Sequence, residues 1–204
     1  MVSGMIASPH THGVDLETAL DFVNTRALEH GESVDHLVSV AAAVSWLREH
    51  GLVHDDRVAQ ARGDAISRIR RTRDALRELL DAVHEQRDPA TAAVDEINEA
   101  LRAREILQLV ASADGLRLDH RHTDDPIADA LARLAEPIVR EVTAGRRDRL
   151  RACANDACRW VFYDASPTGR RRWCDMASCG NRAKAARHRV RVREEKGTGA
   201  RPQP

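Results

Sequence analysis

The chain has 204 residues, with 32 basic and 32 acidic side chains, so its formal net charge is zero. This length suits one medium domain, or one domain with a small module attached. The first 20 residues lack the basic start and apolar run of a signal peptide, and no stretch reaches the roughly 18 apolar residues of a membrane span. We therefore expect a cytoplasmic protein outside the membrane, in a compartment that keeps cysteine reduced.

The zero net charge hides an uneven distribution of charge along the chain. Residues 1–145 carry 16 basic and 26 acidic side chains, a net charge of −10, whereas residues 146–196 carry 15 basic and 6 acidic ones, a net charge of +9. A basic segment attached to an acidic body usually indicates an anionic partner for that segment.

The pattern of apolar residues predicts two helices near the start of the chain. Residues 1–12 are small and polar, which is typical of a flexible start. Apolar side chains at helical spacing then predict a helix over residues 15–25. Ser33 is the candidate cap of a second helix, which we expect to continue to about Glu49.

Two further helices are predicted in the middle of the chain. Asp55 or Asp56 opens a long helix that reaches about Gln86, and Pro89 or Ala90 starts another that runs through Leu101. The apolar residues expected to be buried on the long helix are Val58, Ala65, Ile69, Leu76, Leu79 and Val83, and the next helix runs through Val94, Ile97 and Leu101.

A hairpin and one more helix complete the first 145 residues. The stretch LQLVASADGLRLDH alternates apolar and polar residues about Asp114-Gly115, which indicates a two-residue hairpin turn. Asp125 and Pro126 are the predicted cap and first residue of a helix to about Val142, with a kink or break at Pro137. Residues 1–145 are therefore predicted to form a mainly α domain with a small β-hairpin, large enough to bury a core.

The four cysteines of the chain all lie in its basic segment. Cys153 and Cys158 form one C-x4-C pair, Cys174 and Cys179 form a second, and 15 residues separate the pairs. Two close pairs at such a separation are typical of a zinc site with four thiolate ligands, although x4 is at the wide end of the usual range. We predict one structural Zn²⁺; the alternatives are two disulfides or free thiols.

The residues around the cysteines predict a small finger over residues 146–196, followed by a flexible tail over residues 197–204. Residues 160–163 favour a strand, residues 164–169 a turn, and residues 170–173 a return strand. A helix is expected from Arg182 to about Lys196. A knuckle, a hairpin and a helix bearing the last ligand together indicate a treble-clef-like finger.

Zinc explains why the cysteines and most of the aromatic residues lie together. About fifty residues cannot bury enough apolar area to fold alone, whereas zinc contributes about 10–16 kcal/mol in comparable peptides. A site closed by four cysteines leaves no open position for a catalytic water. The side chains expected to form the core of the finger are Trp160, Phe162, Tyr163 and Trp173.

The sequence Cys179-Gly180-Asn181-Arg182, preceded by FYDAS and RRRWC, closely resembles the CGNR zinc finger family over residues 149–193. The stretches LDFVNT (residues 20–25) and WL (residues 46–47) resemble the helical ABATE domain that commonly precedes this finger. The resemblance implies a bacterial, stress-responsive transcription regulator.

The candidate nucleic-acid contacts come from two clusters of basic residues. One cluster lies before the second cysteine pair and the other on the last helix. The candidates are Arg170, Arg171, Arg172, Arg182, Lys184, Arg187 and Arg191. Arginine forks suit phosphates and guanine edges, so double-stranded DNA is the expected partner. The alternatives are RNA, an acidic protein surface (including that of the chain's own body), or a helix that is simply solvated, with Ala183, Ala186 and Val190 as its narrow apolar face.

The body offers one candidate site for a small-molecule effector, formed by Asp21, Asn24 and Arg26. The alternative is a helix end whose backbone is satisfied by Asn24 and Thr25. The chain shows no glycine-rich phosphate loop, nucleophile elbow or H-E-x-x-H motif, so we do not expect an enzyme. A homodimer would let two fingers bind spaced half-sites, but the sequence does not decide the oligomeric state.

Overall fold

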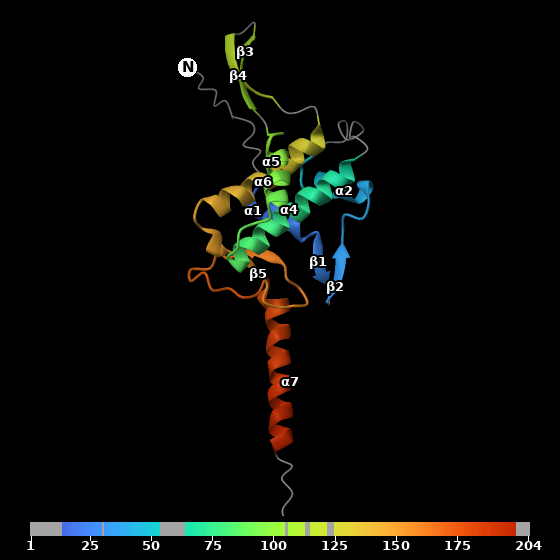
Figure 1. Ribbon diagram of the computed structural model, residues 1–204, viewed down its shortest axis with the longest axis vertical. Coiled ribbons are helices and arrows are strands. Elements are labelled where there is room, and N and C mark those ends of the chain that lie inside the picture. Colours follow the sequence, from blue (N-terminus) through green and yellow to red (C-terminus); the bar gives the residue numbers. More distant parts are fainter. Residues whose placement is uncertain are drawn as a thin grey trace, which may run out of the picture.

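The computed structural model describes residues 14–29, 31–53, 64–104, 106–112, 115–121 and 125–198. In this part of the chain, helices form the body and two-stranded antiparallel hairpins join or follow them. Figure 1 shows the helices gathered in one body, the β3–β4 hairpin at one end and helix α7 at the other. The predicted mainly α fold is confirmed.

The first helix, α1 (Leu16–Asn24), lies where the sequence predicts it. The side chain of Asp15 caps it by accepting a hydrogen bond from the amide of Thr18 at 2.7 Å. Strands β1 (Arg26–Glu29) and β2 (Glu32–Asp35) follow and pair with each other. The sequence analysis missed this hairpin.

The second helix, α2 (Val40–Glu49), starts later than predicted. The side chain of Ser39, rather than that of Ser33, caps it by accepting a hydrogen bond from the amide of Ala42 at 3.1 Å. Ser33 belongs to strand β2 instead. Both serines are chemically suitable caps, and pairing with β1 decides between them.

The long predicted helix is α4 (Ala65–Glu85). It ends at Gln86, as expected, and Gln86 adopts the left-handed conformation. Its predicted start at residues 55–56 and the predicted core residue Val58 lie outside the described residues. Helix α5 (Thr91–Leu101) confirms the next prediction, and Ile97 is buried. Val94, another apolar residue of α5, is 38% exposed.

Strands β3 (Ile106–Ser112) and β4 (Gly115–Arg121) form the predicted second hairpin. Their register pairs Ser112 with Gly115, so Gly115 is a strand residue and not part of the connection. The last helix of the body, α6 (Pro126–Thr143), has the predicted Asp125 cap. It continues without a break through Pro137.

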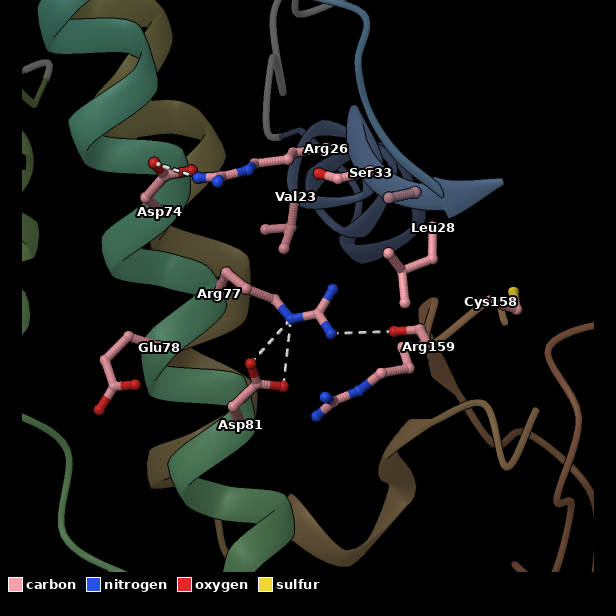
Figure 2. Close-up of a pocket in the computed structure, with 11 residues that line it drawn as sticks. Val23, Arg26, Leu28, Ser33, Asp74, Arg77, Glu78, Asp81, Cys158 and Arg159 are labelled. Carbon is pink, nitrogen blue, oxygen red and sulfur yellow. Dashed lines mark hydrogen bonds and ion pairs between the residues drawn. The ribbon is translucent and has the colours of Figure 1, made fainter. Parts of the chain in front are cut away.

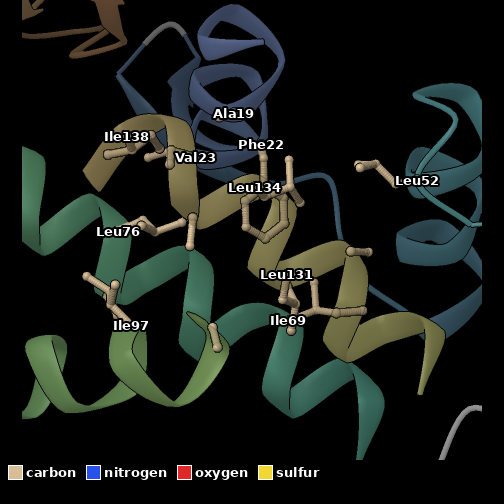
Figure 3. Packing of buried hydrophobic residues seen from close by; sticks show 14 of the residues in the cluster. Ala19, Phe22, Val23, Leu52, Ile69, Leu76, Ile97, Leu131, Leu134 and Ile138 are labelled. Atoms are coloured by element: carbon tan, nitrogen blue, oxygen red, sulfur yellow. The ribbon is translucent and has the colours of Figure 1, made fainter. Parts of the chain in front are cut away.

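The core of the body lies between α1, α4, α5 and α6, and Figure 3 shows its tight packing. Phe22, Ile69, Leu76, Leu134 and Ile138 are fully buried there. Burying a side chain of this size contributes about 1.5–3 kcal/mol. The predicted apolar faces of α1, α4 and α6 therefore meet in one core.

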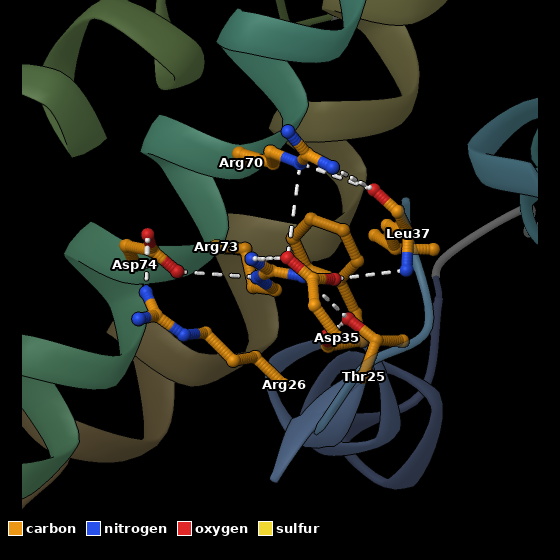
Figure 4. A network of polar contacts seen from close by, with 8 residues as sticks. Thr25, Arg26, Asp35, Leu37, Arg70, Arg73 and Asp74 are labelled. Carbon is orange, nitrogen blue, oxygen red and sulfur yellow. Dashed lines mark hydrogen bonds and ion pairs between the residues drawn. The ribbon is translucent and has the colours of Figure 1, made fainter. Parts of the chain in front are cut away.

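A buried arginine ties the β1–β2 hairpin to α4, as Figure 4 shows. Arg73 is 1% exposed, and two of its nitrogens donate to the carboxylate of Asp35 at 2.7 and 2.9 Å. It also contacts Thr25 at 3.3 Å and Asp74 at 3.2 Å. A buried charge is tolerated only when it is paired in this way.

The finger joins the body through a short hairpin. Strand β5 (Leu150–Ala152), which follows the 3-10 turn η1 (Arg147–Arg149), pairs with β6 (Val161–Tyr163). The predicted return strand at residues 170–173 is not a strand, because β6 pairs with the segment before the first cysteine. Leu150 and Val161 are buried in the same core as the helices of the body.

Helix α7 (Asn181–Thr198) follows η2 (Met176–Gly180), a single π-helical turn. It projects away from the rest of the molecule (Figure 1). Its predicted apolar face is mostly exposed: Val190 is 54% exposed and Ala186 is exposed, while Ala183 is half-buried near the start of the helix. The helix extends through residue 198 into the predicted tail, of which residues 199–204 lie outside the described residues. No helix of the described residues is long and apolar enough to cross a membrane.

Candidate metal centre and nucleic-acid interface

The four predicted ligands come together in one cluster. The sulfur atoms of Cys153, Cys158, Cys174 and Cys179 all lie within 4.8 Å of one another. Cys174 Sγ is 3.7 Å from Cys158 Sγ and 3.8 Å from Cys179 Sγ. A tetrahedral zinc with bonds of 2.3 Å places its sulfurs about 3.8 Å apart, whereas a disulfide requires about 2.05 Å. The cysteines are free thiols, and their arrangement fits zinc.

The first cysteine pair is held by a knuckle between β5 and β6. The amides of Cys158 and Arg159 both donate to the carbonyl of Asn155, at 2.8 and 3.1 Å, and the amide of Cys153 donates to the carbonyl of Trp160 at 2.7 Å. Arg159 has φ +55°, a conformation that few residues other than glycine adopt. This turn brings Cys158 back towards Cys153.

The second pair is held by η2. Asp175 accepts hydrogen bonds from the amides of Ala177 and Ser178, at 3.3 and 2.7 Å, and so caps this turn. Asn181 then donates its side-chain amide to the carbonyl of Ala177 at 2.9 Å. This contact satisfies a backbone carbonyl at the start of α7. The predicted order of knuckle, hairpin and ligand-bearing helix is met only in part, because a loop replaces the hairpin between the cysteine pairs and Cys179 lies in η2, directly before α7.

Asn155 is a residue near the metal site that the sequence analysis missed. Its side-chain amide lies 3.5 Å from Cys179 Sγ, and its Oδ1 accepts from the amide of Ala157 at 3.2 Å. Hydrogen bonds of this kind orient metal ligands and tune their charge. Asn155 lies between Cys153 and Cys158, and this position in the sequence could have suggested a role near the metal site.

The thiols differ in acidity in the metal-free protein. Burial raises the pKa of Cys158 to about 11, and burial together with the neighbouring thiols raises the pKa of Cys174. For Cys179, burial is outweighed by the hydrogen bonds from Asn155 and the other cysteines, so its pKa is lowered. Zinc binding must therefore displace protons from Cys158 and Cys174 near neutral pH.

A buried carboxylate shapes the loop between the cysteine pairs. Asp164 is 0% exposed and accepts hydrogen bonds from the amides of Ser166, at 3.0 Å, and Arg171, at 2.7 Å. Loss of solvent opposes its ionisation, but these hydrogen bonds and the nearby charge of Arg149 outweigh that effect, so the pKa of Asp164 is lowered. Arg149 also donates to the carbonyls of Asp164 and Ser166, at 3.1 and 2.6 Å.

The four aromatic residues of the finger do not all lie in its own core. Phe162 is buried beside the cysteines, and Trp173 packs against the same cluster. Tyr163 packs against the core of the body instead. Trp160 is 39% exposed.

The candidate nucleic-acid residues are all exposed, but they are not equally free to bind a partner. Arg171 donates through Nε to the carbonyl of Trp173 at 2.8 Å and through Nη2 to that of Cys174, and its guanidinium lies over the ring of Phe162. Its structural role competes with a role in DNA binding. Arg172 lies over the ring of Trp173. The remaining exposed candidates are Arg170, Arg182, Lys184, Arg187 and Arg191.

The three candidate effector residues lie in different surroundings. Asn24 is buried and hydrogen-bonded to the backbone of Val161. Arg26 is exposed and forms an ion pair with Asp74 at 3.1 Å. Asp21 is exposed, and its pKa is raised by partial burial and by Glu17. Thr25 donates its hydroxyl to the carbonyl of Phe22 at 2.7 Å, so this helix end is satisfied locally. A shared effector site for the three stays a prediction.

Comparison with known families decides the identity of both parts of the chain. Residues 149–192 match the family described as "CGNR zinc finger". Residues 16–145 match the family ABATE, described as "Putative stress-induced transcription regulator". The chain belongs to the ABATE family. A search of curated proteins finds no match for this chain.

The matched ranges agree with the structure of this ABATE protein. The ABATE match ends at residue 145, just after α6, and the CGNR match begins at residue 149, just before β5. The four clustered cysteines lie within the CGNR range and can bind one zinc ion. Both resemblances noted in the sequence are thereby confirmed.

Proposed function

We propose that this protein is a zinc-dependent transcription regulator that binds duplex DNA through its finger and helix α7. The observation that carries the proposal is the exposure of α7 on a zinc-stabilised base. Residues 181–191 are exposed, apart from half-buried Ala183, and carry Arg182, Lys184, Arg187, Arg189 and Arg191. An α-helix fits the major groove of DNA, where arginine binds phosphates and guanine edges.

The position of α7 favours a partner outside the chain over docking on the acidic body. The helix leaves the finger and points away from the body (Figure 1), and its main contacts in the described residues are with η2. The body (residues 1–145) has a net negative charge, and the finger with its helix (residues 146–196) has a net positive charge. This separation of charge supports binding of a polyanion at one end of the molecule.

The test is fluorescence anisotropy of the zinc-loaded protein on random-sequence duplexes across a salt series. We expect saturable binding whose log–log salt slope is about −0.9 for each neutralised phosphate. The double variant Arg187→Glu, Arg191→Glu should bind more weakly, with a shallower slope. The control Arg102→Glu, Arg140→Glu changes the same net charge at side chains of the body that are 72% and 68% exposed, and should bind like the native protein.

Three outcomes would contradict the proposal. Equal loss of binding in both double variants would indicate a nonspecific effect of net charge. Absence of duplex binding by folded, zinc-loaded protein would favour the second candidate, a finger that binds a protein or RNA partner. Binding of single-stranded RNA in preference to duplex DNA would point to the exposed ring of Trp160, since bases stack on aromatic side chains.

A further inference from the structure

A cleft lies where the body meets the zinc knuckle, and Figure 2 shows its walls. One wall is the β1–β2 hairpin with the end of α1, the second is α4, and the third is the knuckle at Cys158 and Arg159. Its volume is about 370 Å³, within the range of small-molecule sites. The cleft differs from the effector site predicted from the sequence, because Arg26 lines it but Asp21 and Asn24 do not.

One side of the cleft is apolar. It is lined by Val23 and Ala27, which are 1% and 8% exposed, and by half-buried Leu28. The side chains of Val23 and Leu28 point into the space in Figure 2. Leu28 supplies most of the apolar surface on this side that is in contact with water, and an apolar group placed there would cover it, which favours binding.

The charged side of the cleft is largely neutralised within the protein. Arg26 pairs with Asp74 at 3.1 Å, and Arg77 pairs with Asp81 at 3.0 Å. Glu78 is bound by Arg87, a residue outside the cleft, at 2.6 Å. Each acidic side chain that lines the cleft therefore already has a cationic partner.

Arg159 is the one cationic side chain of the cleft without an acidic partner among the described residues. It is exposed at the rim. Its position is fixed through its backbone, because Arg77 Nη2 donates to the carbonyl of Arg159 at 3.0 Å. The cleft thus offers one uncompensated guanidinium beside an apolar wall.

We propose that this cleft binds a small organic anion with an apolar body and a single carboxylate. The guanidinium of Arg159 holds the carboxylate, which it can bind in a two-pronged manner, and Val23, Ala27 and Leu28 contact the apolar part. The proposal concerns the cleft alone and does not depend on DNA binding.

Such a ligand would also act on the metal site. Cys158, a zinc ligand, lines the cleft, and Arg159 directly follows it. A ligand bound to Arg159 stabilises the knuckle conformation that the zinc site requires. Reciprocity then requires zinc-loaded protein to bind the anion more tightly than zinc-free protein, and the bound anion to slow zinc release.

The experiment is a titration of the zinc-loaded full chain with benzoate, followed by amide chemical shifts in NMR. We expect saturable shifts at β1, at the middle of α4 and at the knuckle, with weaker binding of acetate, which lacks the apolar body, and none of benzylamine, which has the opposite charge. Arg159→Gln should weaken benzoate binding roughly three- to fivefold. The control Arg147→Gln, at an exposed arginine of η1 outside the cleft, should leave it unchanged.

Zinc transfer to a chelator provides a second readout. Saturating benzoate should slow the transfer in the native protein and in Arg147→Gln, but not in Arg159→Gln. Arg159→Gly repeats the test with a residue that suits φ +55°, in case glutamine loosens the knuckle. The proposal is overturned by shifts that map elsewhere, by equal binding of benzylamine, by no saturable binding, or by equal benzoate affinities in the Arg159 and Arg147 variants.

Discussion

The side chain of Asn24 forms two hydrogen bonds with the backbone of Val161, which lies 137 residues further along the chain. Asn24 Nδ2 donates to the carbonyl of Val161 at 2.9 Å, and Asn24 Oδ1 accepts from its amide at 3.0 Å. Both residues are 4% exposed. The end of α1 thus pairs with strand β6 as a neighbouring strand would, and it attaches the finger to the body.

Replacing Asn24 with alanine should destabilise the zinc-loaded protein by about 2–4 kcal/mol. The change leaves a buried amide and a buried carbonyl of Val161 without partners, each at a cost of about 1–3 kcal/mol. Urea denaturation measures the free energy of unfolding. Asn98→Ala, at an exposed position of α5, is the matched control and should change stability by less than about 0.5 kcal/mol. Equal effects of the two substitutions would show that the Asn24 contact contributes nothing.

Removal of zinc should destabilise the body as well as the finger. Leu150 and Val161 lie in the body core, and Arg77 of α4 binds the carbonyl of Arg159 in the knuckle. Loss of the metal should therefore lower the melting temperature of the helical signal in circular dichroism and perturb amide resonances of α1 and α4. Chelator treatment and the variant Cys158→Ser should have the same effect, while Lys184→Ala should keep its zinc and its stability.

This prediction would be contradicted if the finger folds independently and the stability of the body does not depend on it. In that case, chelation would change resonances of residues 150–198 only, and the melting of the helical body would stay the same. Calorimetry of the zinc-loaded protein would then show two transitions rather than one cooperative transition.

The Arg73–Asp35 pair predicts a pH-dependent contribution to stability. Asp35→Asn removes the carboxylate charge that compensates the buried charge of Arg73. We expect it to lower the free energy of unfolding by about 1–3 kcal/mol at neutral pH. This is less than for a fully buried pair, because Asp35 is 28% exposed. Glu99→Gln, which removes an exposed ion pair with Arg102, should change stability by less than about 1 kcal/mol.

The sign of the pH dependence follows from the carboxylate. The hydrogen bonds from Arg73 hold the pKa of Asp35 below its usual value in the folded protein. Its contribution is therefore fully present above the unfolded pKa of about 3.9 and is lost as pH falls through the lower folded value. The difference in unfolding free energy between native protein and Asp35→Asn should be constant above about pH 5 and shrink below about pH 4. A constant difference throughout would contradict this assignment.

The sequence predicts features that depend on neighbouring residues better than features that depend on distant ones. The cysteine spacing was sufficient for the metal site because each pair is local and only the zinc ion has to join them. The cap at Asp125 was also recognisable, since it binds amides within three residues. The apolar faces of α1, α4 and α6 follow the helical period.

Long-range pairing could not be predicted from these local patterns. Ser33 and Ser39 are equally good helix caps, and only the pairing of β1 with β2 excludes Ser33. Strand β6 was predicted, but not its pairing with β5 or its attachment to Asn24. The polar cluster at Asn24 suggested a ligand site, yet the partner of Asn24 lies in another part of the chain.

Helix α7 should be only marginally stable until it binds its partner. Arg187 and Arg191 are four residues apart, a spacing at which like charges repel. The narrow apolar face of the helix is mostly exposed, so packing adds little to its stability. Neutralisation by phosphates removes this repulsion. We therefore expect amide hydrogen exchange along α7 to be fast in the free protein and slower in complex with duplex DNA.

Amide hydrogen exchange of the zinc-loaded protein, with and without a short DNA duplex, tests the account most directly. We predict that exchange slows along α7 and at residues 170–173 in the complex, and stays unchanged in α5 and α6. Slower exchange confined to the helical body, or unchanged exchange in α7 when the duplex is fully bound, would contradict a DNA-binding role for α7.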